Sequence, residues 1–248
     1  MSLDEQLRWI ERLTRRPADL AELEDLAPED RRVLETIDPD RLRAVHRTQA
    51  LLTVERWWRA RFPAVLATLE HLYGGPAEAA SRLVSSPAFE AAQGEDETGA
   101  AFVGALFDLS ADPDWRGPDW IFDLLGYEYL LSTGLPRRAR HEPVDEDLEA
   151  RLLPHARWYA GGRLRRPALV VSFAWPVGAL ATQPHDADPD PHDLVFLLGP
   201  QDAVELSGDG FADAVELLAS GANDDVLEEG LGPSAPTVLA HLRAEGAY

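Results

Sequence analysis

The chain has 248 residues, of which 45% are hydrophobic and 8% aromatic, enough apolar material for one large domain or two ordinary ones. It contains no cysteine, which excludes disulfides, thiolate metal sites and cysteine nucleophiles. Its formal net charge of -21 repels phosphate backbones and anionic lipid, so we expect neither a nucleic acid nor a membrane as its partner. All 23 basic residues are arginine, and the lack of lysine excludes a Schiff-base lysine and a P-loop lysine.

The first residues, Met1 to Glu5, are acidic where a signal peptide is basic. No apolar run reaches the length needed to span a membrane, and nothing in the composition indicates an oxidising compartment. We therefore expect a cytoplasmic protein.

Arginine is concentrated near the start of the chain. Residues 1–61 hold 13 acidic residues and 12 arginines, whereas 62–150 hold 17 and 5, and 151–248 hold 14 and 6. Any basic surface is thus expected on the N-terminal helices. The candidate residues for it are Arg8, Arg12, Arg15, Arg16, Arg41, Arg43, Arg47, Arg56, Arg59 and Arg61.

The first half of the chain has helical periodicity. Ser2 and Glu5 form a capping-box pattern at the start of a first amphipathic helix. The pair Asp38-Pro39 predicts the start of a long helix, because aspartate is a favourable cap and proline suits the first helical position. Pro63 predicts an interruption, and Gly74-Gly75 predicts the end of this helical run.

Two more helices are predicted at 96–109 and 118–131, where apolar and aromatic residues recur every three or four positions. These aromatics are interpreted as the core of a helix bundle rather than as a ligand site. Residues 131–147 are rich in proline and charge and predict a linker between two lobes. A short helical or turn segment is expected over 148–159.

The last third has a different pattern. Strands are predicted at 168–175, 193–198 and 203–207; the first alternates large and small side chains, and the second is almost wholly apolar. The segment 199–202, Gly-Pro-Gln-Asp, predicts a turn between the second and third strands. The third strand is expected to leave one edge of the sheet open.

Three short helices are predicted after the sheet, beginning near Phe211, Asp224 and Pro236, with Asp209 and Asn223 as caps. The predicted fold class is therefore α+β. An N-terminal all-helical lobe over 1–140 would precede a C-terminal winged-helix-like module over 155–248, with a three-stranded antiparallel sheet followed by three helices. This order of elements indicates binding rather than catalysis.

One loop has the residue types of metal ligands. His185 to Asp193 contains two histidines among aspartates, which could bind iron, manganese or zinc. Its spacing matches no defined metal site, and we prefer to interpret it as a solvated acidic loop. His46 and His71 lie in helical patterns and are interpreted as structural histidines. No nucleophile elbow or dinucleotide-binding glycine motif is present, so nothing in the sequence argues independently for catalysis.

Several segments together resemble one family. Residues 61–75, Arg-Phe-Pro-Ala-Val-Leu to Leu-Tyr-Gly-Gly, followed by 79–87, resemble a helical region of the partner proteins that accompany multinuclear non-haem iron oxidative enzymes, the methanobactin-type partner subunits among them. Residues 120–131, with Tyr127-Glu128-Tyr129, are similar to a later helix of that family. Residues 204–211, Val-Glu-Leu-Ser-Gly-Asp-Gly-Phe, resemble its module that recognises precursor peptides.

The resemblance implies a non-catalytic subunit in the biosynthesis of a ribosomally synthesised and post-translationally modified peptide. The modifying enzyme would be a separate chain that carries the iron and forms a heterodimer with this one, which would itself hold no cofactor. The winged-helix-like module would recognise the leader of the precursor peptide, and the helical lobe would dock the enzyme.

The mechanism that the resemblance implies is strand addition. The leader would pair with the open edge of the third strand, and its apolar side chains would enter a groove beside the last helix. The implied peptide-binding residues are Ala203, Val204, Glu205, Leu206 and Ser207 on the strand, with Val238, His241, Leu242 and Glu245 on the helix. No catalytic or metal-binding residue is assigned to this chain.

Two alternatives stay open at this point. A winged-helix DNA-binding regulator would need a basic recognition helix, yet residues 235–245 contain one arginine and one acidic residue. A stand-alone metalloenzyme would use the His185–Asp193 loop and would bind metal stoichiometrically.

Overall fold

The structure is a computed structural model that describes residues 9, 28, 32, 38–92, 96–184, 187–200 and 202–248. It divides into two compact units, Met1–Gly117 and Pro118–Tyr248. The predicted helix that begins at Ser2 lies outside the described residues. The predicted α+β class is confirmed, because helices accompany an antiparallel sheet.

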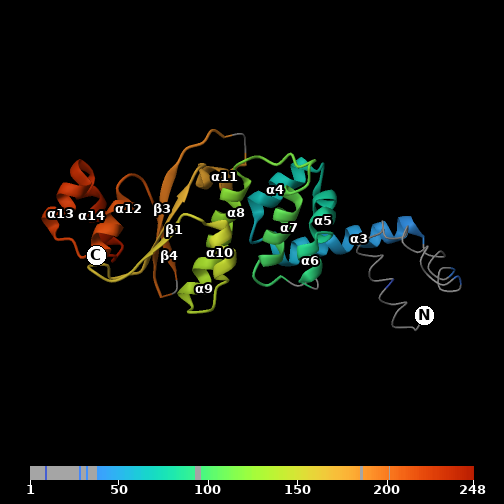
Figure 1. Ribbon diagram of the computed structural model, residues 1–248, viewed down its shortest axis with the longest axis horizontal. Helices are drawn as coiled ribbons and strands as arrows, with labels where there is room; N and C mark the ends of the chain where they lie inside the picture. The colour runs from blue at the N-terminus through green and yellow to red at the C-terminus, as the bar shows by residue number, and fades with distance from the viewer. Residues whose placement is uncertain are drawn as a thin grey trace. The chain divides into compact units, whose positions relative to one another are not determined.

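The described part of the first unit is helical (Figure 1). Asp38 caps the first of these helices, since its Oδ1 accepts a hydrogen bond from the backbone N–H of Asp40 at 2.9 Å. The predicted interruption before Pro63 is confirmed, and Gly74 and Gly75 separate two helices. The elements are α3 (Pro39–Thr53), the π-helical turn η2 (Val54–Trp58), α4 (Pro63–Leu72), α5 (Pro76–Val84), α6 (Pro87–Ala91) and α7 (Ala100–Ser110).

Aromatic rings and one buried carboxylate hold this unit together. Phe102 stacks on Phe62 at 4.4 Å between ring centroids and lies 5.1 Å from the ring of Trp58. Asp96 is 4% exposed, and its Oδ2 accepts hydrogen bonds from the indole N–H of Trp58 and the backbone N–H of Phe102, both at 2.8 Å. The carboxylate therefore ties η2 to the first turns of α7.

The second unit combines a sheet with helices on both of its faces (Figure 1). The strand order β1-β2-β3-β4 is antiparallel throughout. The strands are β1 (Ala156–Tyr159), β2 (Ala168–Phe173), β3 (His192–Leu198) and β4 (Ala203–Ser207). The helices before β4 are α8 (Ile121–Tyr129), the π-helical turn η3 (Leu130–Gly134), α9 (Leu135–Ala139), α10 (Glu146–Leu152) and α11 (Val177–Thr182). Those after it are α12 (Phe211–Ala219), α13 (Asp224–Leu231), the 3₁₀ turn η4 (Gly232–Ser234) and α14 (Ala235–Ala244).

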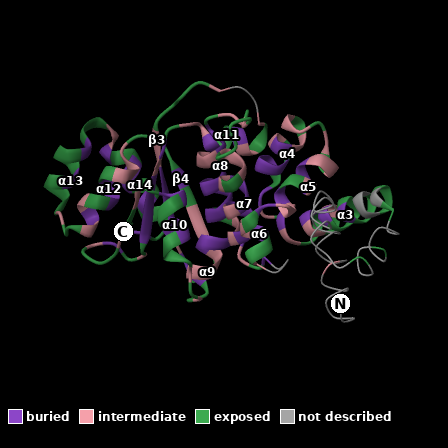
Figure 2. Ribbon diagram, turned by 45° about the vertical axis from the view of Figure 1, so that its right-hand side comes forward, coloured by how far each residue is buried: buried purple, intermediate pink, exposed green. Residues whose placement is uncertain are grey.

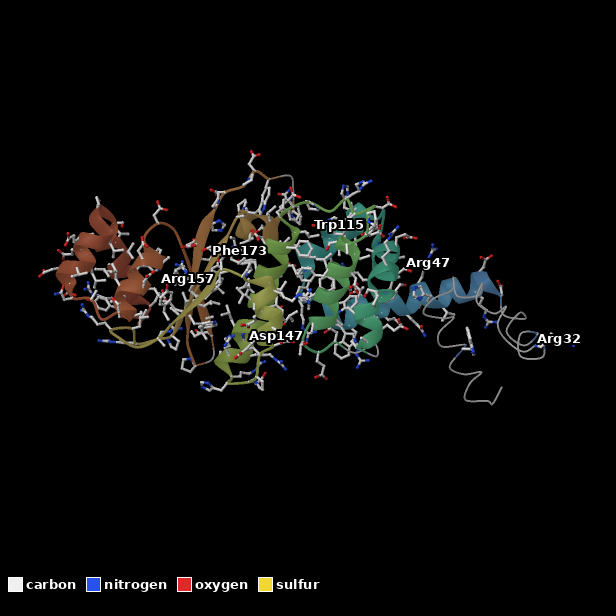
Figure 3. All side chains as sticks on the ribbon, viewed as in Figure 1. Arg32, Arg47, Trp115, Asp147, Arg157 and Phe173 are labelled. Atoms are coloured by element: carbon white, nitrogen blue, oxygen red, sulfur yellow. The ribbon has the colours of Figure 1, made fainter. Side chains whose placement is uncertain are left out.

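The two central strands are buried on both faces (Figure 2). Phe173 belongs to the face that packs on α8, where its ring lies 6.2 Å from that of Tyr127. Arg157 of β1 pairs with Val170 in the register and so lies on the opposite face from Phe173 (Figure 3). Val170 and Val195 on that opposite face join the core formed with α12, α13 and α14.

The structure corrects the predicted number of strands. Residues 156–159, expected to be helical or a turn, form β1 and pair with 168–171, so the sheet has four strands rather than three. The sequence pattern missed β1 because four residues are too few to show a clear alternation.

The predicted linker over 131–147 is wrong. These residues form most of η3, all of α9 and the start of α10. Pro136 is the second residue of α9, which directly follows the π-helical turn η3, so the chain stays helical through this proline. A Cβ at Gly134 would lie 3.1 Å from a carboxylate oxygen of Glu149, so this glycine allows close packing with α10. The predicted division into 1–140 and 155–248 accordingly differs from the observed units, in which α8, α9 and α10 belong with the sheet.

The caps of the C-terminal helices were predicted only in part. Asn223 caps α13, because its Oδ1 accepts from the N–H of Val226 at 3.0 Å. Asp209 does not cap α12; Gly210 holds that position with a φ of 86°, and no side chain accepts from the first turn. Glycine adopts this left-handed conformation without steric cost.

Replacing Trp58 by phenylalanine should destabilise the protein. The change keeps an aromatic ring but removes the N–H that Asp96 accepts, which leaves a buried carboxylate with one donor fewer, at a cost of about 1–3 kcal/mol. Urea unfolding of the full chain measures the loss. Trp57→Phe is the matched control, since the Trp57 side chain is only half-buried; equal effects of the two substitutions would contradict the proposed role of Asp96.

Candidate functional site

Strand β4 is an edge strand, paired with β3 on one side only among the described residues. The backbone N–H of Leu198 donates to the carbonyl of Pro167 at 2.9 Å, so the backbone N–H and C=O groups of Leu198 point towards β2. The N–H of Gly199 donates to the carbonyl of Asp202 at 2.7 Å, across the turn into β4. In an antiparallel pair, the backbone N–H and C=O groups of successive residues point to alternate sides of the strand. The backbone groups of residues 204 and 206 therefore bond to β3, whereas those of residues 203, 205 and 207 point to the open side.

The nine predicted peptide-binding residues divide into core and surface positions. Leu206, Val238 and Leu242 are buried and share one hydrophobic core, so the structure brings β4 and α14 together. These three side chains fill the interior and are not free to line a groove. The half-buried residues are Ala203, Val204 and Glu245, and the exposed ones are Glu205, Ser207 and His241.

Glu205 is held against α8. The hydroxyl of Tyr127 donates to Oε2 of Glu205 at 3.0 Å. Burial, followed by the nearby carboxylate of Glu205, raises the pKa of Tyr127 above its ordinary value, since both disfavour the phenolate. An acidic side chain in the middle of an edge strand also opposes uncontrolled pairing between sheets.

Arg166 was missed by sequence reasoning, because no local pattern marks which arginine turns inward. Its Nε donates to the carbonyl of Leu198 at 3.0 Å, and its Nη1 donates to the carbonyl of Glu245 at 3.0 Å. Its Nη2 lies 3.4 Å from a carboxylate oxygen of Asp202, the residue before β4. One guanidinium thereby fixes the end of α14 beside the start of β4.

His241 is the exposed member of the predicted set on α14. Its ring makes an edge-to-face contact with Phe211 of α12, with 5.5 Å between centroids. This contact orients an exposed imidazole on the last helix without burying it.

The described residues contain no group of three or more histidine and acidic side chains able to hold a metal ion. His185 and Asp186 of the acidic loop lie outside the described residues. The ring of His192 donates through Nδ1 to the carbonyl of Asp190 at 2.8 Å. Asp193 accepts from the hydroxyl of Ser172 at 2.5 Å and forms an ion pair with Arg157 at 3.4 Å.

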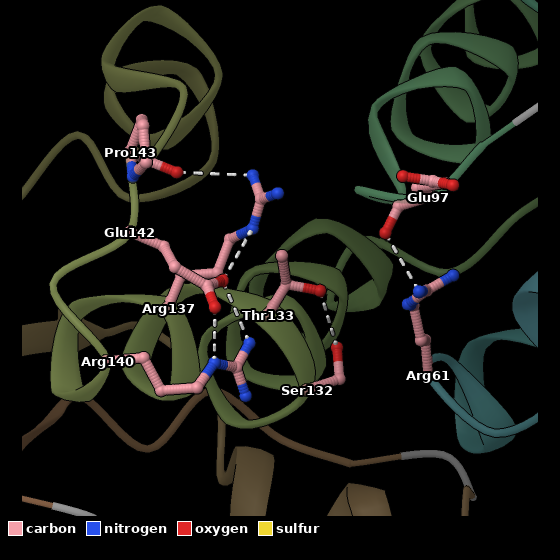
Figure 4. A network of polar contacts seen from close by, with 8 residues as sticks. All are labelled: Arg61, Glu97, Ser132, Thr133, Arg137, Arg140, Glu142 and Pro143. Carbon is pink, nitrogen blue, oxygen red and sulfur yellow. Dashed lines mark hydrogen bonds and ion pairs between the residues drawn. The ribbon is translucent and has the colours of Figure 1, made fainter.

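The predicted basic surface on the N-terminal helices is partly neutralised. The ion pairs within it are Arg47–Glu78 at 3.1 Å, Arg59–Glu55 at 2.9 Å and Arg59–Glu70 at 2.6 Å. Arg61 donates to backbone carbonyls, including that of Glu97 at 2.8 Å (Figure 4). Arg8, Arg12, Arg15 and Arg16 lie outside the described residues, and so does the side chain of Arg43. His46 is a buried structural histidine as predicted, with its Nε2 2.9 Å from the hydroxyl of Ser81.

No helix in the described part of the chain is long and apolar enough to cross a membrane. No protein-family model matches the sequence, and comparisons with curated proteins and with solved structures also find no match.

The buried tyrosines of α8 should make stability fall at alkaline pH. Burial and then Glu149 raise the pKa of Tyr129 to about 12, and the pKa of Tyr127 is also raised. An unfolded tyrosine ionises near pH 10, so the contribution of each group is complete below about pH 10 and is lost as the pH rises towards the folded value. Urea unfolding at about pH 8 and about pH 11 should therefore show a loss of free energy of unfolding. The double variant Tyr127→Phe, Tyr129→Phe should lose less free energy of unfolding between these two pH values. A loss identical to that of the unchanged protein would contradict the assignment of the pH dependence to these tyrosines.

Proposed function

We propose that this chain is a non-catalytic partner subunit that binds the leader of a ribosomally synthesised precursor peptide and presents it to a separate multinuclear non-haem iron oxidative enzyme. The observation that carries the proposal is the open side of β4, an edge strand that offers a row of backbone donors and acceptors next to α14 on a sheet whose two faces are covered. In this proposal β2, β3 and β4 with α12, α13 and α14 act as a winged-helix-like recognition element.

An extended peptide is the ligand that suits such an edge. Its backbone would exchange hydrogen bonds with residues 203, 205 and 207, and each such bond contributes about 1 kcal/mol net. These bonds fix the register of the peptide and are independent of its sequence. Selectivity must then come from side chains beside the strand.

The helix α14 supplies side chains on one face of the added strand. Val204 and Leu206 point to the face that α14 covers, and Arg166 fixes the end of α14 beside the start of β4. Peptide side chains that point the same way would meet the exposed imidazole of His241 and the half-buried Glu245. The proposed groove therefore uses the surface of α14 and leaves Val238 and Leu242 in the core.

The helical first unit would dock the enzyme in this proposal. A subunit that holds both the leader and the enzyme raises the effective concentration of the modifiable peptide at the iron site. The chain would take no part in the oxidation itself.

Co-purification tests the proposal. The tagged full-length chain is co-expressed with the products of its neighbouring genes, and retained proteins, peptides and iron are measured. We expect an iron-containing oxidative enzyme and a precursor peptide to be retained, with the iron assigned to the enzyme after the subunits are separated. Retention of neither partner at micromolar concentration overturns the proposal.

Two substitutions in the same experiment locate the peptide. Glu205→Pro removes an N–H that points to the open side, leaves the ladder to β3 intact, and should lower peptide affinity about tenfold or more while the enzyme is still retained. Glu205→Ala removes the same side chain but keeps the N–H, so it should change the affinity by no more than about threefold. Equal losses in the two variants would contradict strand addition at β4.

A further inference from the structure

A cavity of about 680 Å³ opens at the end of the sheet where β3 leads into β4. Leu198 at the end of β3 and Gly199 and Pro200 of the turn into β4 contribute to its wall. Trp158 of β1 contributes an aromatic surface that is 41% exposed. The arginines of the lining are Arg138, Arg165 and Arg166. The cavity thus adjoins the turn that leads into the strand that the proposed function uses.

The charge around this cavity is opposite to that of the chain. Of the nine arginines in residues 118–248, three line the cavity and two more pair with Glu142 of its wall, although the whole chain carries a net charge of -21. These five are Arg137, Arg138, Arg140, Arg165 and Arg166. A concentration of positive charge on an acidic protein attracts anions to one place.

Acidic side chains neutralise part of this charge, since Glu142, Glu149 and Asp202 pair with four of the five arginines, but Arg165 keeps its charge unpaired among the described residues. Glu142 is already paired with Arg140 at 2.7 Å and with Arg137 at 3.7 Å, neither of which lines the cavity (Figure 4). Arg138 is paired with Glu149 and lies over the ring of Trp158, with 4.4 Å from the guanidinium carbon to the ring centroid.

Arg165 is available to bind an anion. It is exposed, and its side chain forms no hydrogen bond or ion pair within the part of the chain that the structure describes. Its backbone is fixed, because its N–H donates to the carbonyl of Ala247 at 3.0 Å. A guanidinium on an anchored backbone is suited to bind a carboxylate through two parallel hydrogen bonds.

The opposite end of β4 has the reverse charge. A second cavity, of about 500 Å³, is lined there by Asp193, Asp209 and Asp213. An acidic side chain of a bound peptide would be repelled at that end and attracted at the other. The two ends of the open edge are therefore electrostatically distinct.

We propose that the basic cavity binds an aspartate or glutamate side chain of the peptide, placed just after the segment that pairs with β4. The inference rests on the proposed function, since it needs a peptide at this edge. A strand added antiparallel to β4, as every pair in this sheet is antiparallel, ends beside Ala203 and the cavity. The charge pattern thus selects both the direction of the peptide and an acidic residue on its C-terminal side.

Selection from a random peptide library on the full-length chain tests this proposal. Enriched peptides are synthesised with an amidated C-terminus, so that only side chains can supply the carboxylate, and their affinities are measured by fluorescence anisotropy. We expect the enriched peptides to carry an acidic residue after an extended apolar segment. Changing that residue to its amide, or Arg165→Ala, should each weaken binding about tenfold, and the two changes together should weaken it little further.

Arg116→Ala is the matched control, because it removes the same charge from an exposed arginine in the first unit. Thermal unfolding of each variant verifies that it is folded. Peptides that lose affinity with Glu205→Pro but not with Arg165→Ala overturn this inference and leave the proposed function standing. Failure to enrich any peptide that is sensitive to Glu205→Pro overturns both.

Discussion

The structure of the second unit depends on one constraint: its sheet is covered on both faces. The side chains of β2 and β3 are enclosed between α8 and its neighbours on one face and α12, α13 and α14 on the other. Backbone groups of a sheet can then meet an external partner only in its plane, at an edge. β4 lies at the end of the strand order, and an edge strand presents half of its N–H and C=O groups outward. A peptide can therefore pair with the sheet at β4.

Polar side chains control what this edge can accept. Glu205 places a carboxylate in the middle of β4 and is held by Tyr127, which discourages sheet-to-sheet pairing while leaving the backbone groups accessible. Arg166 joins the turn before β4 to the end of α14, because it contacts the carbonyls of Leu198 and Glu245 and the carboxylate of Asp202. A rigid frame around an open edge reduces the ordering cost of binding an extended peptide.

The sequence predicted the parts of the fold that have strong local signals. The apolar run of β3 and the alternation of β2 identify the strands, and Asn223 identifies the start of α13. The prediction from sequence was wrong where tertiary packing overrides local composition. Pro136 and Gly134 are typical of a linker, yet both lie in packed helical turns. The candidate edge strand could be found from its position after the turn at 199–202. The basic cavity could not be predicted from the sequence, because its arginines come from α9 and from the segment before β2, which are far apart in sequence.

The backbone amides of β4 differ in whether they bond to β3, and site-resolved hydrogen exchange measures this difference directly. In the free chain, the amides of Val204 and Leu206 should exchange slowly because they bond to β3, whereas those of Glu205 and Ser207 should exchange fast. Binding of the precursor peptide should slow the exchange of the Glu205 and Ser207 amides. No change in the exchange of these two amides when the peptide is bound would contradict strand addition at this edge.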